Sequence, residues 1–150
     1  MSEPKSVNRV VCVDAGLVIK FISPESDSAQ VEALFARWKQ DNVAMIAPAF
    51  APAEMDSVLR QKVVRKELTS EVADAAFQLV CQLPITIDAE TDCRTRAWEL
   101  AKQFELPTVY DAVYLALAEA HQCDFWTADR KLFARVKDQL VYVKHLSNSK

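Results

Sequence analysis

Hydrophobic residues are most concentrated in the segment Thr108–Ala120, and their pattern predicts a buried central helix. Alanine and leucine, which favour helices, dominate the segment, and apolar residues cover nearly every face from Ala112 to Ala118. One acid, Asp111, lies near the start of the segment. A carboxylate at the entrance of a buried helix is costly unless something compensates it. Asp111 therefore needs a compensating partner elsewhere in the chain.

Apolar residues recur at intervals of three and four in other segments, which predicts amphipathic helices around the central one. The clearest begins at Ser26 and carries its apolar stripe on Val31, Leu34, Phe35 and Trp38. The further expected helices are Gly16–Ile22, Pro52 to about Lys66, Thr69 to Pro84, about Ala89 to Phe104, and Asp129 to about Val136. In the helix from Pro52, the residues expected to face inward are Met55, Val58, Leu59 and Val63. In the helix from Thr69, the apolar stripe consists of Val72, Ala76, Leu79 and Val80.

Short apolar and β-branched runs between these helices predict the strands of a sheet. The first run is apolar on both faces and ends on an acid, which is typical of a strand buried in a parallel sheet. The expected strands are Arg9–Asp14, Val43–Ala47, Ile85–Ile87, Asp124–Thr127 and Leu140–Val143. Strands that alternate with helices predict an α/β fold with a central, mainly parallel sheet of four to five short strands. The expected core runs from about residue 9 to 143, and the tail from Leu146 onward is expected to fray.

The composition is that of one globular domain: 150 residues, 51% hydrophobic and 26% charged. A net charge of −3 argues against a general basic coat for nucleic acid but allows a local basic patch. The polar N-terminus and the lack of a long apolar run predict neither a signal peptide nor a membrane helix. The cysteines show no CxxC spacing, which predicts reduced, mostly buried thiols in a cytosolic protein. They are Cys12, Cys81, Cys93 and Cys123.

Four acids fall where a parallel sheet places its functional sites, at the carboxyl ends of strands. Asp14 ends the first strand, Asp129 follows the fourth, and Glu54 and Asp111 lie in the first turns of helices. Carboxylates that meet at one edge repel by about 4 kcal/mol per pair at an effective dielectric constant near 20. Such a cluster needs a cation, and oxygen ligands without a nearby His or Cys set suit Mg²⁺ or Mn²⁺. The arrangement suits metal-assisted hydrolysis of phosphodiesters.

Local explanations exist for three of these acids. Thr108 and Asp111 have the spacing of a capping box, the helix dipole favours Glu54, and Asp129 can cap its own helix. Asp14 has no such explanation, because it closes a wholly apolar strand. The chemical signal is therefore the joint placement of the acids rather than any one of them.

Other residues add less to the functional picture. Basic residues near two of the acids either cover solvated helix faces or hold a nucleic-acid backbone at the site. They are Arg60, Lys62, Arg65, Lys66, Arg130, Lys131 and Arg135. His121 and His145 are isolated and are expected at the surface or at strand ends. Because Gly16 is the only glycine, a glycine-rich phosphate loop is excluded.

Four segments resemble, in the same order, the motifs of PIN-domain proteins, and especially of the VapC-like toxins. They are Val11–Phe21, Ala53–Leu59, Tyr110–Ala118 and Trp126–Leu132. The resemblance implies a PIN fold, a three-layer α/β/α sandwich, in a single domain over residues 1–150. It also implies an Mg²⁺- or Mn²⁺-dependent endoribonuclease, the toxin of a type II toxin–antitoxin system, that hydrolyses RNA in the cytoplasm. A homodimer and a small antitoxin partner that blocks the site are implied as well.

The same motifs assign roles to individual residues. Asp14, Glu54, Asp111 and Asp129 are implied as the catalytic, metal-binding acids, with Thr127 as a supporting hydroxyl. Our hypothesis is that Asp14 and Asp111 hold the main ion and that Asp129 completes its site directly or through water. Glu54 would bind the ion or help deprotonate the attacking water.

Three further side chains are expected to contact the RNA, namely Lys20, Tyr110 and Arg130. The chain departs from the family pattern at Gly16, where Ser or Thr is usual, and at Ser57, where Asn is usual. Both departures concern groups that position the metal or its water.

These departures support an alternative, a PIN-fold binding module with weak or no catalysis that acts through protein or RNA partners. The apolar stripes at Phe35–Trp38 and Phe77–Val80 would suit a partner helix, although core packing is the commoner use of such residues. A phosphoacceptor receiver domain fits poorly, because its first strand typically ends in paired acids. Here Asp14 is followed by Ala15 and Gly16.

Overall fold

A five-stranded parallel sheet forms the centre of the protein in the computed structural model, which describes residues 9–23 and 28–148. The strands are β1 (Val10–Val13), β2 (Ala44–Pro48), β3 (Ile85–Asp88), β4 (Asp124–Thr127) and β5 (Val143–His145). Their order across the sheet is β3-β2-β1-β4-β5, and every neighbouring pair is parallel. β1 therefore lies in the middle, which explains why its sequence is apolar on both faces.

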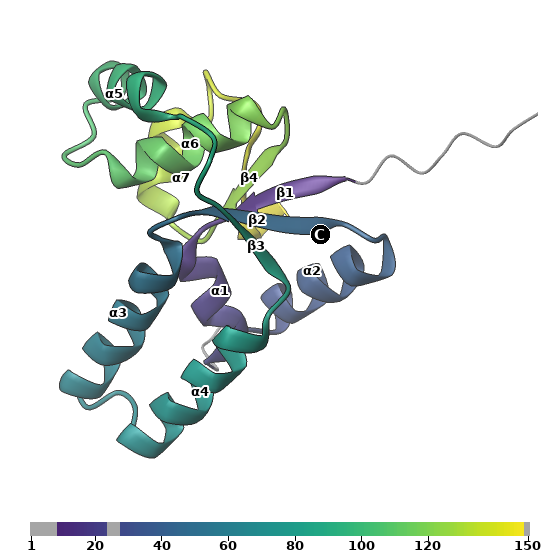
Figure 1. The fold of residues 1–150 in the computed structure, drawn as a ribbon, viewed down its shortest axis with the longest axis vertical. Coiled ribbons are helices and arrows are strands. Elements are labelled where there is room, and N and C mark those ends of the chain that lie inside the picture. Colours follow the sequence, from purple (N-terminus) through teal and green to yellow (C-terminus); the bar gives the residue numbers. More distant parts are fainter. Residues whose placement is uncertain (1–8, 24–27, 149–150) are drawn as a thin grey trace, which may run out of the picture.

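Helices cover both faces of this sheet (Figure 1). They are α1 (Ala15–Ile22), α2 (Ser28–Gln40), α3 (Ala51–Val64), α4 (Ser70–Gln82), α5 (Arg94–Gln103), α6 (Tyr110–Ala120) and α7 (Arg130–Val136), followed by a short 3-10 helix, η1 (Leu146–Asn148). Helices α1 to α4 lie on one face and α5 to α7 on the other (Figure 1). The predicted three-layer α/β/α sandwich is confirmed.

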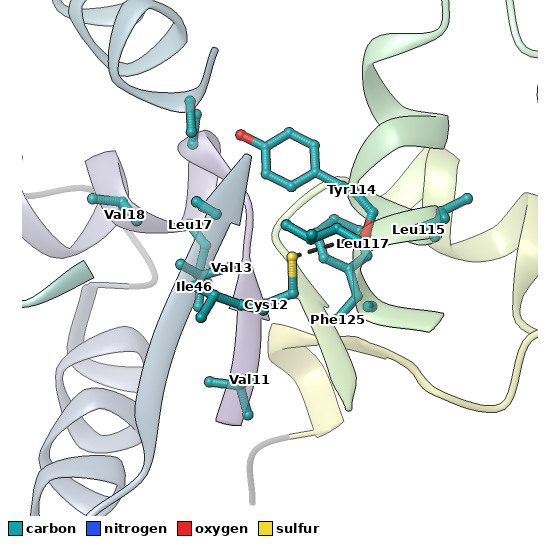
Figure 2. Packing of buried hydrophobic residues seen from close by; sticks show 14 of the residues in the cluster. Val11, Cys12, Val13, Leu17, Val18, Ile46, Tyr114, Leu115, Leu117 and Phe125 are labelled. Carbon is teal, nitrogen blue, oxygen red and sulfur yellow. Dashed lines mark hydrogen bonds between the residues drawn. The ribbon is translucent and has the colours of Figure 1, made fainter. Parts of the chain in front are cut away.

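The predicted central helix is confirmed as α6, which packs against β1, β2 and β4. Its residues from Ala112 to Ala118 are buried, apart from a half-buried Val113. Figure 2 shows Tyr114, Leu115 and Leu117 of this helix against the side chains of the strands. The thiol of Cys12 on β1 lies 3.8 Å from the carbonyl oxygen of Tyr114, so strand and helix are in direct contact.

Three boundaries differ from the prediction. The last strand begins at Val143 rather than Leu140, because the amide of Val143 bonds the carbonyl of Leu140 in a turn that leaves Val141 80% exposed. Leu146, expected to fray, is buried and begins η1. α5 begins at Arg94 rather than near residue 89. The predicted start of α2 at Ser26 lies outside the described residues.

The loop before α5 explains its late start. The carboxylate of Asp88 accepts hydrogen bonds from the amides of Glu90 and Thr91, and that of Asp92 accepts one from Arg94. These side chains satisfy backbone groups in a non-helical conformation, a known alternative to helix formation for Asp.

The apolar stripes predicted for the helices are buried to different degrees. In α2, Val31, Leu34, Phe35 and Trp38 are all buried, as predicted. In α3, Met55 and Leu59 are buried, whereas Val58 and Val63 are half-buried. In α4, the prediction is wrong for half the stripe: Val72 and Leu79 are about 49% and 50% exposed. α4 packs on α1 and α3 rather than on the sheet, and this narrow contact buries Ala73 and Ala76.

The cysteines are unpaired, as predicted, but only two of them are buried. All four cysteines are free; Cys12 and Cys93 are buried, Cys123 is half-buried and Cys81 is exposed. Within the described ranges, no helix is both long and apolar enough to cross a membrane.

Candidate active site

A cleft of about 620 Å³ opens at the carboxyl edge of the sheet, and the four predicted acids line it. Asp14 follows β1 and Asp129 lies two residues after β4, while Glu54 and Asp111 lie in the first turns of α3 and α6. Parallel strands bring their carboxyl ends, and the start of the helices that follow, to one edge of the sheet. The topology therefore gathers acids that lie far apart in the sequence.

Asp14 is held by two hydrogen bonds. The amide of Leu17 donates to Oδ1 at 2.7 Å, which makes Asp14 the N-cap of α1, and the hydroxyl of Thr127 donates to Oδ2. The expectation that Asp14 has no local structural role is therefore wrong. The fully buried Thr127 also accepts from the amide of Asp129 at 2.9 Å. Its hydroxyl thus connects two of the acids, as expected of a supporting group.

Two of the acids, Asp14 and Asp111, have raised pKa values. Burial raises the pKa of Asp14 to about 6, and the nearby negative charges of Asp111 and Asp129 add to this effect. The pKa of Asp111 is also raised, first by burial and then by Asp129 and Glu54. The carboxylates are therefore close enough to repel, and a cation in the cleft would relieve this repulsion.

Capping explains Asp129 but not Asp111. Oδ1 of Asp129 accepts from the amide of Leu132 at 3.0 Å, so its predicted role as a helix cap is confirmed. The capping box predicted for Thr108 is wrong, because the N-cap of α6 is Val109, which has no side-chain acceptor. Within the described part of the chain, the carboxylate of Asp111 makes no hydrogen bond or ion pair, which leaves both oxygens available to a ligand.

Tyr114 holds Glu54 and is the positioning residue that sequence reasoning missed. Its hydroxyl donates to Oε1 of Glu54 at 2.7 Å, although the residue as a whole is only 1% exposed. Figure 2 shows the hydroxyl end of Tyr114 near the arrowhead of β2, where the strands end. Burial and the Glu54 carboxylate raise the pKa of this phenol, so it stays protonated as a donor. The available signal was a tyrosine within the apolar part of the helix, three residues after Asp111.

The residues expected to contact substrate divide into two groups. Lys20 and Tyr110 line the cleft, whereas Arg130 begins α7 with an exposed side chain and is not part of the lining. Sequence reasoning also missed Phe50 and Gln61, which line the cleft as well. The Phe50 ring packs edge-on against Tyr110 and Tyr114, with ring centroids 5.1 and 5.5 Å apart.

The donor chemistry of the cleft fits a hard divalent cation. Carboxylates line it without any histidine or cysteine, which is the ligand type of Mg²⁺ and Mn²⁺. Across residues 9–23 and 28–148, no three His, Cys, Asp or Glu side chains are already arranged to hold a metal ion. The acids therefore surround the cleft rather than forming a closed site.

Comparison with known proteins identifies the family. The model of the PIN domain family matches residues 11–139, a range that includes all four acids. This chain belongs to the PIN domain family. The chain is also 31% identical to ribonuclease VapC3 of Mycobacterium tuberculosis over 132 residues, which cover 87% of this chain and 90% of that protein. The family resemblance seen in the sequence motifs is confirmed.

Solved structures share the fold of this PIN domain at low sequence identity. A crystal structure of a Pyrobaculum aerophilum protein has a TM-score of 0.67 at 17% identity and covers 93% of this chain and 92% of its own. A toxin–antitoxin complex from Klebsiella pneumoniae has a TM-score of 0.61 at 18% identity, covering 91% and 97%. Mycobacterium tuberculosis VapC20, a Sarcin-Ricin loop cleaving toxin, has a TM-score of 0.63 at 14% identity, covering 89% and 98%.

Proposed function

We propose that this PIN-domain protein is a metal-dependent endoribonuclease that hydrolyses phosphodiester bonds of RNA. The observation that carries the proposal is the convergence of Asp14, Glu54, Asp111 and Asp129 on one cleft, where burial, and then the charges of neighbouring acids, raise the pKa values of Asp14 and Asp111. The similarity to ribonuclease VapC3 over most of both chains supports the reaction type.

Mg²⁺ or Mn²⁺ held by these acids would activate a water, orient the phosphate and offset charge on the leaving oxygen. Among the residues that the structure describes, the two carboxylate oxygens of Asp111 have no partner, and Thr127 fixes the orientation of Asp14. Tyr114 donates a hydrogen bond to Oε1 of Glu54. The other carboxylate oxygen of Glu54, Oε2, would then bind the ion or accept a proton from the attacking water. Lys20, in the cleft wall, would attract the phosphate backbone.

The proposal extends to the biological setting. We infer a toxin of a type II toxin–antitoxin system that acts on RNA in the cytoplasm, forms a homodimer and is blocked by a small antitoxin. Support comes from the relative named VapC3 and from the fold shared with a toxin–antitoxin complex.

Substitution of single acids tests the reaction. We expect Asp14→Asn and Asp111→Asn each to abolish Mg²⁺-dependent RNA cleavage while leaving the circular dichroism spectrum unchanged. The matched control is Asp74→Asn, which removes a charge from an exposed position of α4 and should retain full activity. EDTA should abolish cleavage by the parent protein. If it does and either acid variant is still fully active, the assignment of the site is wrong.

Two observations support the alternative, a binding module without catalysis. The acids do not form a ready ligand set for an ion among the described residues, and Gly16 and Ser57 lack groups that the family usually has there. A protein that neither cleaves RNA nor is stabilised by Mn²⁺ would favour this alternative.

A further inference from the structure

His145 is a buried histidine that is not part of the cleft lining and has no role in the reaction described above. It is the last residue of β5, and only 5% of it is exposed. It lies opposite Thr127 in the pairing of β5 with β4, beside the strand end that leads to Asp129. A buried polar ring is costly unless its nitrogens are hydrogen-bonded. The hydrogen-bond partners of His145 therefore show which part of the chain it holds.

These partners also show which nitrogen of the ring carries the proton. The backbone amide of Ser147 lies 3.0 Å from Nδ1 and can only donate, so Nδ1 accepts and Nε2 carries the hydrogen of the neutral ring. The hydroxyl of Ser147 lies 2.9 Å from Nδ1 and can turn its hydrogen toward the same nitrogen. Nε2 lies 3.3 Å from the carbonyl oxygen of Ala128 and donates to it. His145 thus reaches from β5 into the turn between β4 and α7.

The carbonyl of Ala128 belongs to the same peptide unit as the amide of Asp129. That amide donates to the hydroxyl oxygen of Thr127 at 2.9 Å. His145 therefore bonds one end of this planar unit, and Thr127 bonds the other end. Because a peptide plane turns as one piece, bonds at its two ends prevent it from rotating.

The orientation of this peptide affects two of the acids in the cleft. The hydroxyl of Thr127 accepts from the Asp129 amide and donates to Oδ2 of Asp14, so its direction depends on the peptide plane. The side chain of Asp129 starts at the Cα atom on the edge of the same plane and caps α7 through the amide of Leu132. A rotated plane would take the amide away from Thr127 and would redirect the Asp129 carboxylate.

The ring of His145 also packs on Phe133 of α7, with ring centroids 5.5 Å apart. Packing alone would be a structural role, which depends on the shape and volume of the ring. The bond to Ala128 is different, because it depends on a donor at the position of Nε2. Substitutions that keep this donor and substitutions that lose it therefore separate the two roles.

We propose that His145 is a positioning residue of the acidic cleft, which fixes the peptide between Ala128 and Asp129 and thereby orients Asp129 and Thr127. It acts through the backbone of the turn and touches neither RNA nor a metal ion. Its effect on the reaction rests on the proposed ribonuclease function. The fixed peptide itself is measurable without RNA or metal.

Two substitutions of His145 separate its hydrogen bonds. Glutamine places its amide nitrogen near the position of Nε2 and can still donate to Ala128. Asparagine is shorter, so it can satisfy Ser147 but not Ala128. Both variants lose the ring contact with Phe133, which makes each a control for the other.

Hydrogen exchange of single amides, recorded by NMR on the full chain in EDTA, gives the first readout. We expect the Asp129 amide to exchange at least about tenfold faster in His145→Asn than in the parent, as for the loss of one hydrogen bond. In His145→Gln its rate should stay close to that of the parent. The amide of Phe125, which donates to the carbonyl of Tyr142 at 2.9 Å, reports general loosening of β4 and β5 and should change equally in both variants.

Cleavage of RNA with Mn²⁺ gives the second readout. We expect His145→Asn to lower kcat about tenfold with KM unchanged, as for other groups that orient metal ligands. His145→Gln should recover most of this loss. His121→Asn is the matched control, because His121 lies 2.7 Å from Asp88 and outside the cleft lining, so the variant should keep full activity.

Equal exchange of the Asp129 amide in His145→Asn and His145→Gln would overturn the inference, because the ring rather than the donor would then matter. Phe133→Leu extends the test to the case in which both His145 variants fail to fold. It removes the ring contact and keeps the bond to Ala128, so faster exchange of the Asp129 amide there would assign the effect to packing. A parent protein that does not cleave RNA contradicts the proposed function, whereas the exchange rates still decide the role of His145.

Discussion

Gly16 is the single residue whose replacement is most informative about catalysis. It is exposed in the first turn of α1, and a Cβ added there would meet only Oδ1 of Asp14, at 3.7 Å, which is ordinary van der Waals contact. Serine or alanine therefore fits without moving the chain. The family usually has a hydroxyl here, so its restoration beside Asp14 bears directly on the proposed metal site.

We predict that Gly16→Ser increases the rate of Mn²⁺-dependent RNA cleavage. Gly16→Ala is the control, since both variants should gain about 0.5–1 kcal/mol of stability from replacing a helical glycine. Only the serine variant supplies a hydroxyl. Cleavage rates and thermal melting of both proteins check the prediction, and equal rates in the two variants would contradict it.

Asp14 also predicts a pH dependence of stability. Its folded-state pKa of about 6 lies above the ordinary value of 3.8, so the native state holds this proton more tightly than the unfolded chain. The stability contributed by the protonated form is complete below pH 3.8 and is lost as the pH rises through 6. In EDTA at pH 7.5, Asp14→Asn should therefore be more stable than the parent, by on the order of 2 kcal/mol.

At pH 3.5 this advantage should disappear, because Asp14 is then protonated in both states of the parent protein. Thermal melting in EDTA at the two pH values measures the difference. Equal melting temperatures of variant and parent at pH 7.5 would show that the Asp14 carboxylate carries no such cost.

At the scale of elements, α6 places two functional groups one turn apart. Asp111 and Tyr114 lie at positions i and i+3 of the helix, so they share a face and reach the same cleft. The buried remainder of the helix holds both side chains in place. α6 thus contributes a carboxylate to the cleft and also positions Glu54 of α3 through the Tyr114 hydroxyl.

Tyr114→Phe removes this hydroxyl and keeps the ring in the core. We predict a lower kcat for RNA cleavage, by roughly tenfold, because Glu54 loses the donor that orients it. Tyr142→Phe is the matched control, since Tyr142 also donates to a glutamate, Glu119, which does not line the cleft. Comparable loss of activity in both variants would indicate a general effect on stability rather than on Glu54.

At the scale of the whole molecule, the fold brings the negative charges of four segments together at one rim of the sheet. Mn²⁺ that binds the native state and not the unfolded chain should raise the melting temperature. At one hundred times its dissociation constant the ion adds about 2.7 kcal/mol, which corresponds to roughly 5–10 °C for a chain of this size. Asp111→Asn should reduce the shift.

Differential scanning fluorimetry with Mn²⁺ from micromolar to millimolar concentrations measures this effect, with Ca²⁺ as a comparison for ion selectivity. An absence of any shift up to millimolar Mn²⁺ in the parent protein would contradict the metal site and favour the binding module.

Predictions from the sequence succeeded where the signal is repeated along the chain. Apolar periodicity located α2, the dense run of apolar residues located α6, and the alternation of strands and helices predicted the parallel sheet. They failed where the outcome depends on neighbours far away in the sequence. The stripe of α4 has the pattern of a core face, but α4 packs mainly on α1 and α3, and Val72 and Leu79 remain exposed.

The fold class and the placement of the acids at one rim can be predicted from the sequence alone, because both follow from strand periodicity and from the geometry of parallel sheets. Which group holds which acid depends on tertiary contacts. The bonds from Thr127 to Asp14 and from Tyr114 to Glu54 join residues on different elements. The burial of His145 is equally a result of packing, since a residue's contacts depend on how whole elements meet rather than on local pattern.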